Sequence, residues 1–244
     1  MNDIPVAYDH QKKTTDFIVA NSQCMITSDP GTGKTRAVLD AHAILGGKTL
    51  VLAPLSILEA AWAEDIRKFQ PDIKYGVAYA KNRKQVFEDN ENEMVITNFE
   101  AVNFLSKNTH YCEQFDTIVI DEFTAFKNRE AKRSKNLKKI ISYFTNRIAM
   151  SGTPNSNTIL DIWHPTLLVD DGKRLGARFF QFRSQVCTPK FNGFANEWID
   201  KPDAEDSVAN ALRDITIRYG LNECMDLPDN ITRTINTNLS KQIQ

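Results

Sequence analysis

The sequence predicts an α/β protein built on a parallel sheet of about seven strands, with helices on both faces of the sheet. Two observations support this prediction. Short apolar segments rich in β-branched residues alternate along the chain with segments of helical periodicity, which is typical of strands joined by crossover helices. The composition, with 41% apolar and 25% charged residues over 244 positions, is sufficient to bury a full core in one or two domains.

The strands are expected at continuous apolar runs, because a strand covered on both faces lacks the polar alternation of a half-exposed strand. Their expected positions are 23–27, 48–53, 73–79, 93–97, 116–120, 145–150 and 215–219. After about residue 165 the alternation weakens, and turn signals occur at 170–172 and 191–193.

Two of the intervening helices have clear patterns. One is expected to begin at Ser56, where Ser56 and Glu59 have the spacing of a capping box. Its apolar face would consist of Leu58, Trp62, Ile66 and Phe69. The other is expected over about 130–144, with one apolar face made of Leu137, Ile140, Ile141 and Phe144.

The segment 29–35, Asp-Pro-Gly-Thr-Gly-Lys-Thr, has the pattern of a phosphate-binding loop between a strand and a helix. Its two glycines let backbone N–H groups turn toward an anion, and the helix that begins at Lys34 presents its positive end to the same place. Lys34 is expected to reach the nucleotide phosphates and Thr35 to hold Mg²⁺. The pattern departs at Ser28, where the motif has glycine. The alternative is a surface loop that happens to precede a helix.

The apolar run 118–120 ends in two carboxylates, Asp121 and Glu122. A buried parallel strand delivers such acids to its carboxyl end, where open α/β sheets bind ligands. We expect Asp121 to hold the metal ion and Glu122 to orient the attacking water in phosphoryl transfer. The alternative is that both acids cap the following turn, and the phosphate loop upstream makes this alternative weaker.

The net charge of −1 gives no overall attraction to nucleic acid or to an anionic membrane, so such binding would need a local patch. No apolar stretch approaches the roughly 20 residues needed to span a bilayer, and residues 1–5 lack the pattern of a signal peptide. We therefore expect a cytoplasmic protein without a membrane partner. Cys24, Cys112, Cys187 and Cys224 lack zinc-binding spacing and are expected to be free, mostly buried thiols.

The segment 127–139 holds seven basic residues against one acid, Glu130. On a helix, Lys132, Lys135 and Lys139 would share the face opposite the apolar stripe. This face is either a surface that follows nucleic-acid phosphates or a solvated helix face. Further along, Trp163 and the phenylalanines at 179, 180 and 182 are expected to be core residues rather than base-stacking surfaces.

Six motifs follow one another in the order found in superfamily-two helicases. They are 8–11, the loop 29–35, 49–56, 95–100, 121–128 and 151–154 with Asn157. The chain therefore resembles, over nearly its whole length, the first RecA-like lobe of such a helicase, and most of all the Swi/Snf-type DNA translocases. The resemblance implies a RecA-like fold of the P-loop NTPase class.

The resemblance also implies residue roles. Catalysis would fall to Lys34, Asp121 and Glu122, with Thr35 and Asp121 as metal ligands. The nucleotide would contact Gln11, which reads adenine, and Asp29, Gly31, Thr32, Gly33, Lys34, Thr35 and Arg36. DNA would contact Pro54, Leu55, Ser56, Thr97 and Asn98, and hydrolysis would be coupled to motion through Ser151, Gly152 and Thr153. Outside this motif order, Thr97 and Asn98 would be helix caps, and Ser151 and Thr153 would be turn residues.

Two departures from the family pattern stand out. Thr124 occupies a position where the family usually has histidine. The family also has a second RecA-like lobe with arginine fingers, whereas this chain ends at Gln244. We expect 1–234 to form the first lobe and 235–244 to begin a linker to the second, as in a lobe cut from a longer bacterial or phage protein.

The expected function is therefore the ATP-binding motor lobe of a DNA-dependent ATPase, a translocase or helicase. ATP and Mg²⁺ would be its cofactors, and DNA and a second lobe its partners. One alternative is another superfamily-two motor, such as the translocating subunit of a restriction enzyme or a strand-separating repair helicase. Another is a non-hydrolysing nucleotide-binding or DNA-binding module, although the retention of Lys34 and Glu122 argues against it.

Overall fold

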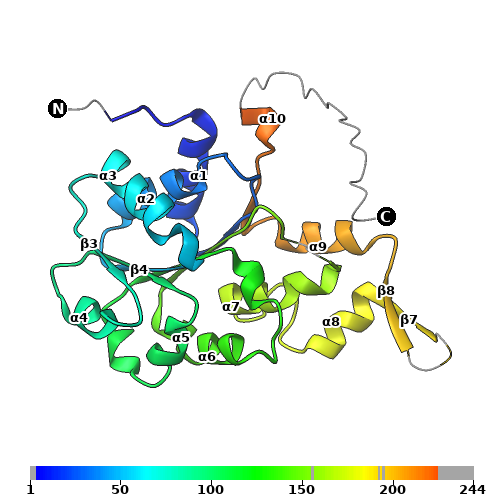
Figure 1. The fold of residues 1–244 in the computed structure, drawn as a ribbon. Coiled ribbons are helices and arrows are strands. Elements are labelled where there is room, and N and C mark those ends of the chain that lie inside the picture. Colours follow the sequence, from blue (N-terminus) through cyan, green and yellow to red (C-terminus); the bar gives the residue numbers. More distant parts are fainter. Residues whose placement is uncertain (1–3, 155–156, 192, 194–195, 225–244) are drawn as a thin grey trace, which may run out of the picture.

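The computed structural model describes residues 4–154, 157–191, 193 and 196–224. Seven strands form one sheet in the order β3-β4-β2-β5-β6-β1-β9, and every neighbouring pair is parallel (Figure 1). The strands are β1 (Gln23–Ile26), β2 (Thr49–Ala53), β3 (Tyr75–Ala78), β4 (Met94–Asn98), β5 (Thr117–Asp121), β6 (Asn146–Met150) and β9 (Thr216–Ile217). All seven expected strands are thus confirmed, whereas the expected lobe boundary at 234 lies outside the described residues.

Helices connect the strands on both faces of the sheet. The α-helices are α1 (Asp9–Ala20), α2 (Lys34–Leu45), α3 (Glu64–Phe69), α4 (Arg83–Glu88), α5 (Ala101–Leu105), α6 (Lys132–Ile140), α7 (Trp163–Asp170), α8 (Phe179–Val186), α9 (Ala204–Leu212) and α10 (Leu221–Cys224). Short 3₁₀ turns are η1 (Leu55–Ile57), η3 (Thr109–Tyr111), η4 (Phe123–Phe126), η5 (Ile141–Tyr143) and η6 (Ile159–Ile162), and η2 (Leu58–Ala63) is a π-helix.

Two apolar clusters lie on opposite faces of the sheet. One joins α1, α2, η2 and α3 through side chains such as Ile18, Leu39 and Trp62. The other joins α5, α6 and α7 and includes Leu137 and Leu167. Figure 1 shows α1, α2 and α3 grouped on one side of the sheet and α5, α6 and α7 on the other. The inner strands of the sheet are buried on both faces, which explains their continuous apolar sequence, whereas the edge strands β3 and β9 are partly exposed.

The segment expected to form an α-helix from Ser56 is not a simple α-helix. It begins as the 3₁₀ turn η1, continues as the π-helix η2, and becomes α-helical only at Glu64. The expected capping box is wrong, because Ser56 lies within η1 and not at the N-cap of a helix. The expected apolar face holds for Leu58, Trp62 and Ile66, which are fully buried, and in part for Phe69, which is only partly buried.

The expected helix over 130–144 is confirmed as α6 followed by η5, and its apolar face is buried. Beyond α7 the chain forms α8 and then an antiparallel hairpin of β7 (Cys187–Phe191) and β8 (Asn196–Asp200). The hairpin projects from the body of the molecule at the right of Figure 1. Sequence patterns marked its turn at 191–193 but not its strands.

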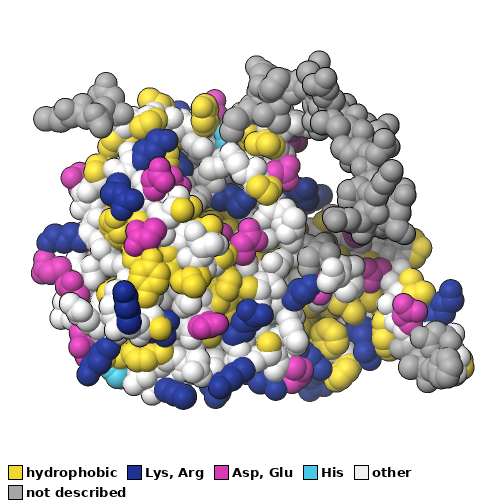
Figure 2. Space-filling model, viewed as in Figure 1, with side chains coloured by type: hydrophobic (Ala, Val, Ile, Leu, Met, Phe, Trp, Pro, Cys, Tyr) yellow, Lys and Arg dark blue, Asp and Glu magenta, His cyan; other side chains and the backbone are white. Residues whose placement is uncertain are grey.

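The cysteines are free, as expected, with three buried and Cys224 partly buried. Among the described residues, no helix has both the length and the apolar character that a membrane crossing requires. On the face shown in Figure 2, basic and acidic side chains are interspersed, in keeping with the net charge of −1.

Candidate nucleotide and DNA sites

The segment between β1 and α2 has the backbone of an anion-binding loop. Gly31 and Gly33 adopt φ values of 84° and 80°, in the left-handed region that glycine enters without strain. The Thr32 hydroxyl donates to the Asp29 carbonyl at 2.9 Å and braces the turn. Helix α2 begins at Lys34, so its unpaired N–H groups and positive dipole end open on the loop.

The loop lysine bonds to its own loop. The Lys34 Nζ donates to the Ser28 carbonyl at 2.8 Å and to the Asp29 carbonyl at 3.1 Å. Burial lowers the pKa of Lys34, and the carboxylates of Glu122 and Asp121 act in the opposite direction. The ammonium therefore lies within electrostatic reach of both acids, on loop carbonyls that a phosphate group would replace.

Ser28, which departs from the glycine of the motif, has a structural role that the sequence did not indicate. Its side chain is buried, and its hydroxyl accepts the backbone N–H of Tyr219 at 3.0 Å. The neighbouring Asp29 carboxylate accepts the N–H of Leu221 at 3.1 Å. Both bonds attach the loop to the segment that follows β9.

Asp121 closes β5 and is almost fully buried. One of its carboxylate oxygens, Oδ2, accepts the indole N–H of Trp62 at 2.8 Å. Burial raises the pKa of Asp121, and the Trp62 hydrogen bond partly opposes this shift. Asp121 and the Thr35 hydroxyl offer the oxygen donors that Mg²⁺ prefers, so the donor chemistry fits this ion.

Glu122 follows in a left-handed conformation, with φ at 57°, which turns the chain sharply after β5. Its Oε2 accepts the hydroxyl of Ser151 at 2.9 Å. Ser151 is fully buried, and its oxygen also accepts the N–H of Thr153 at 3.1 Å. The first residue expected to couple hydrolysis to motion therefore bonds directly to the expected water-positioning acid.

Gly152 places this coupling segment against the phosphate loop. A Cβ added at Gly152 would lie 2.7 Å from the Pro30 ring. Further along, Lys127 and Asp161 form an ion pair of 2.9 Å that joins the segment after β5 to η6. The carboxyl ends of β1, β5 and β6, which are neighbours in the sheet, thus meet at one place.

Gln11 lies against the loop on the α1 side. Its Nε2 donates to the Thr32 carbonyl at 3.3 Å, and its Oε1 accepts the N–H of Tyr8 at 3.0 Å. The His10 ring also bonds to the Thr32 carbonyl, at 2.8 Å. A cavity of about 940 Å³ lies beside these residues, with Arg218 on its lining. Tyr8 and His10 line this cavity, and a role of Gln11 in reading adenine stays a prediction.

Arg36 is engaged away from the loop. Its Nε pairs with the Asp40 carboxylate at 2.7 Å, and its Nη1 donates to the Pro5 carbonyl at 3.3 Å. The guanidinium also lies 4.4 Å from the centre of the Phe69 ring. The Phe69 contact joins α2 to α3, and the Pro5 bond joins α2 to the chain before α1. A role of Arg36 in nucleotide binding stays a prediction.

The residues expected to contact DNA follow adjacent strands. Ala53 at the end of β2 pairs in register with Asn98 at the end of β4. Leu55 is 59% exposed, an unusual position for a large apolar side chain, and Ser56 is exposed beside it. Pro54 and Asn98 are partly exposed, so these four residues share one surface edge.

Thr97 does not belong to this surface. Its side chain is fully buried, and its hydroxyl donates to the Ala78 carbonyl on β3 at 2.7 Å. The expectation that this side chain contacts DNA is therefore wrong. Thr97 is one residue before Asn98 and points to the opposite side of the strand, as alternation requires.

The basic run of 127–139 is divided by the structure. Lys132 and Arg133 line a hollow of about 530 Å³ together with Arg83, whose Nη2 donates to Asn98 Oδ1 at 3.0 Å. Lys135 instead pairs with Glu130 at 2.7 Å. Within this run, Lys132 and Arg133 are therefore the basic residues that line the hollow next to Asn98.

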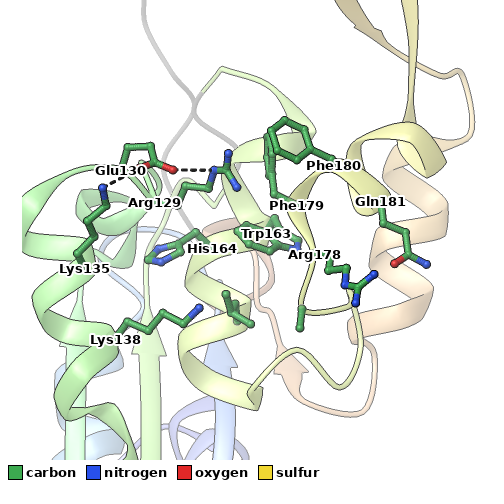
Figure 3. Close-up of a pocket in the computed structure, with 12 residues that line it drawn as sticks. Arg129, Glu130, Lys135, Lys138, Trp163, His164, Arg178, Phe179, Phe180 and Gln181 are labelled. Atoms are coloured by element: carbon green, nitrogen blue, oxygen red, sulfur yellow. Dashed lines mark ion pairs between the residues drawn. The ribbon is translucent and has the colours of Figure 1, made fainter.

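Lys135 borders a second hollow, of about 540 Å³, between α6, α7 and α8 (Figure 3). Trp163 on its floor is buried, as expected, and so is Phe182. The expectation is wrong for Phe180, which is 61% exposed. Its ring is flanked by the Arg129 and Arg183 guanidinium groups at 4.9 and 5.0 Å, and these cations take the place of core packing.

Several known proteins are similar to this chain. Its sequence is 26% identical over 238 residues to protein p41 of Acyrthosiphon pisum secondary endosymbiont phage 1, a match that covers 86% of the chain and 49% of p41. It is 32% identical over 149 residues to an uncharacterized ATP-dependent helicase of Mycoplasma genitalium, which covers 57% of the chain and 14% of that protein. The chain thus spans about half the length of p41 and a smaller share of the Mycoplasma helicase.

Among solved structures, the fold matches the Sulfolobus solfataricus SWI2/SNF2 ATPase core in complex with dsDNA. The TM-score is 0.74 at 22% identity, and the match covers 91% of this chain and 47% of that one. The sequence pattern of the SNF2-related domain matches residues 10–243, almost the entire chain. The chain therefore belongs to the SNF2-related domain family.

Proposed function

We propose that this chain is the nucleotide-binding lobe of a DNA-dependent ATPase motor. One observation carries the proposal: Lys34, Glu122 and Ser151 come from three different strand ends and meet at the phosphate loop, within bonding or electrostatic reach of one another. Two relatives support it by name, one as an ATP-dependent helicase and one as an ATPase core bound to dsDNA. Bacterial and phage relatives favour a cytoplasmic location in a bacterium or infected host.

The residues divide the work as follows. Lys34 would leave the loop carbonyls and bind the β- and γ-phosphates, while Gln11 faces adenine. Thr35 and Asp121 would hold Mg²⁺, which neutralises phosphate charge when bound. Glu122 would orient the attacking water in line with the γ-phosphate, and Ser151 fixes the direction of that carboxylate through its 2.9 Å bond.

Two substitutions test the site. Lys34→Ala should weaken ATP binding and abolish turnover, because the phosphates lose their cation. Glu122→Gln should retain ATP binding and reduce turnover by about 10²- to 10⁴-fold, because an amide fills the space without acting as the acid does. ATP affinity by calorimetry and phosphate release in the protein that contains this chain measure both. Full turnover in either variant would contradict the assignment, and a wild-type protein that binds ATP without hydrolysing it would favour a non-hydrolysing module.

DNA would lie along the edge made by Pro54, Leu55, Ser56 and Asn98. The hollow lined by Arg83, Lys132 and Arg133 extends this edge and brings positive charge that the chain as a whole lacks. Polar and backbone groups at a sheet edge can position a phosphate backbone without reading sequence.

Replacing Lys132 and Arg133 with alanine should lower the slope of log affinity against log salt by about 0.9 for each lost phosphate contact on duplex DNA. Lys135→Ala and Lys139→Ala together form the matched control, since Lys135 pairs with Glu130 and neither lysine lines this hollow. DNA binding measured across a salt series decides the matter. An equal loss of slope in both double variants would indicate that the whole basic face contacts phosphates. An unchanged slope in both would indicate that none of these residues contacts DNA.

A further inference from the structure

Trp62 is the one large aromatic side chain that bonds to the expected metal carboxylate among the described residues. It is fully buried, and its indole N–H donates to Asp121 Oδ2 at 2.8 Å. A buried indole N–H requires a hydrogen-bond partner, and backbone carbonyls usually provide one. Here the partner is the carboxylate side chain at the end of β5.

Trp62 lies on the π-helix η2, which directly follows η1. Leu55 at the start of η1 is 59% exposed and belongs to the edge proposed to contact DNA. A short stretch, 55–62, therefore connects that surface to Asp121 with no other element between. Single π-turns are rare within helices and often occur at functional sites, because the extra residue in the turn costs stability unless its position is used.

We propose that Trp62 is a positioning residue, whose N–H holds the Asp121 carboxylate in the orientation that receives the metal ion, and that η1 and η2 make this orientation depend on DNA seated at 54–56. The inference rests on the proposed function and specifies how its DNA surface reaches its metal site. Groups that orient a metal ligand without touching the metal typically change affinity by about 10- to 100-fold when removed. If DNA at the turn favours the bound position of Trp62, the metal ion must favour DNA binding by the same factor.

The direct test removes only the N–H. Trp62 is replaced in the 244-residue chain by 3-benzothienylalanine, which keeps the bicyclic ring and has sulfur in place of N–H. Mn²⁺ is then titrated, by electron paramagnetic resonance, into the chain saturated with ADP. The Mn²⁺ affinity is expected to fall by about 10-fold or more. An affinity within twofold of the wild type would overturn the proposal.

The same replacement at Trp163 is the matched control. That indole is also buried, and its N–H donates at 3.0 Å to the Gly176 carbonyl, a backbone group outside the phosphate site. We expect its Mn²⁺ affinity to stay at the wild-type value. An equal fall in both variants would mean that Mn²⁺ affinity reports general loosening, and this result also contradicts a specific role for Trp62. Thermal unfolding of each variant verifies that the chain is folded.

The connection to DNA is tested by repeating the titration with a short duplex. In the wild-type chain the duplex is expected to raise Mn²⁺ affinity by about fivefold or more, the lower end of typical coupling between sites. In the Trp62 variant this ratio should approach one. A ratio of one in the wild type, or the same ratio in both chains, would overturn the connection. A wild-type chain that binds neither ADP with Mn²⁺ nor the duplex would instead contradict the proposed function itself.

Discussion

The phosphate loop and the acid end of β5 face each other, but they are stabilised by different kinds of bonds. On the loop, Lys34 donates to two carbonyls of its own loop, so its cation has local partners that a phosphate must displace. At the acid end, Asp121 and Glu122 each accept one hydrogen bond from another element, Trp62 and Ser151. The loop lysine is thus held within its own loop, whereas the two acids are held by side chains from other elements.

This difference indicates which region would have to rearrange when a nucleotide binds. On the proposed function, a nucleotide would have to break the Lys34 bonds before it gains the contacts of the loop, so we expect binding by this lobe to be weak. The acids need little rearrangement, because buried donors already fix them. If the proposed function holds, catalysis would depend on groups that stabilise charge from the opposite side, because Arg36 and Arg218 belong to this same lobe.

The largest effect should come from adding a second RecA-like lobe downstream of this chain. The acids are in place without it, so hydrolysis by the chain alone should be near background and little changed by DNA. An arginine finger from an opposing lobe is worth about 10³ to 10⁵ in rate where it has been measured. Phosphate release by the two proteins at saturating ATP measures the gain. A brisk, DNA-stimulated ATPase from the chain alone as a monomer would show that the acid end needs no partner and would break the comparison.

A smaller effect is expected from Ser151→Ala, which removes the donor from Glu122 and leaves the loop unchanged. Turnover should fall by about 10-fold, a fraction of the 10²- to 10⁴-fold that a positioned general base contributes, while ATP affinity is retained. Ser134→Ala is the matched control, because Ser134 is also buried and its hydroxyl donates to the Phe126 carbonyl at 3.3 Å rather than to a carboxylate. Turnover and ATP affinity are measured for each variant, because the first reports on the acids and the second on the loop. Weakened ATP binding in Ser151→Ala would show that the acids and the loop are not independent.

The smallest effect concerns stability, because each region has one buried histidine. His42 on α2 bonds to the Thr49 hydroxyl, and His164 on α7 bonds to the Phe126 carbonyl after the acids. Burial lowers the pKa of both rings below the ordinary value of 6.5, so the unfolded chain binds protons first as pH falls. Their contribution to stability is therefore present above about pH 6.5 and is lost below it, at up to about 1.4 kcal/mol per pH unit for each ring.

Urea unfolding between pH 7.5 and 5.5 measures this slope. His42→Gln and His164→Gln should each reduce it, and His110→Gln should leave it unchanged, because His110 is exposed. If only one of the two variants reduces the dependence of unfolding free energy on pH, then only that histidine is stabilised in its neutral form by the fold. Equal slopes in all variants would assign the acid sensitivity to other groups.

Most of the fold was predictable because its strands are continuous apolar runs and its motifs are local in sequence. The loop 29–35 and the acids at 121–122 were found in this way, and the structure brings them together. The alternation of strand residues, which buries Thr97 beside the partly exposed Asn98, could have been read from the sequence, but the motif resemblance outweighed it. Ser28 was recognised only as a departure, because its partner Tyr219 is far away along the chain.

Other features depend on tertiary contacts that no local pattern reports. From the sequence, Trp62 could be explained fully as a core residue on the apolar face of a helix. Its hydrogen bond to Asp121 becomes visible only in the structure. The π-turn that carries it cannot be distinguished from an α-helix by apolar spacing over so few residues. The hairpin of β7 and β8 was missed because its residues 188–191 are exposed and polar or mixed, without the buried face that marks a strand.

The bonds from Ser28 and Asp29 to the segment after β9 give the molecule a mechanical property. Two backbone N–H groups, of Tyr219 and Leu221, attach the chain leaving the sheet directly to the phosphate loop. Strand β9 is only two residues long, and the backbone N–H groups of Met25, Thr27 and Asp29 donate to the carbonyls of residues 215, 217 and 219 beside it, so the side-chain bonds extend this short backbone pairing to the loop. Tension applied along the chain at 219–221 would therefore act directly on residues 28 and 29 of the loop.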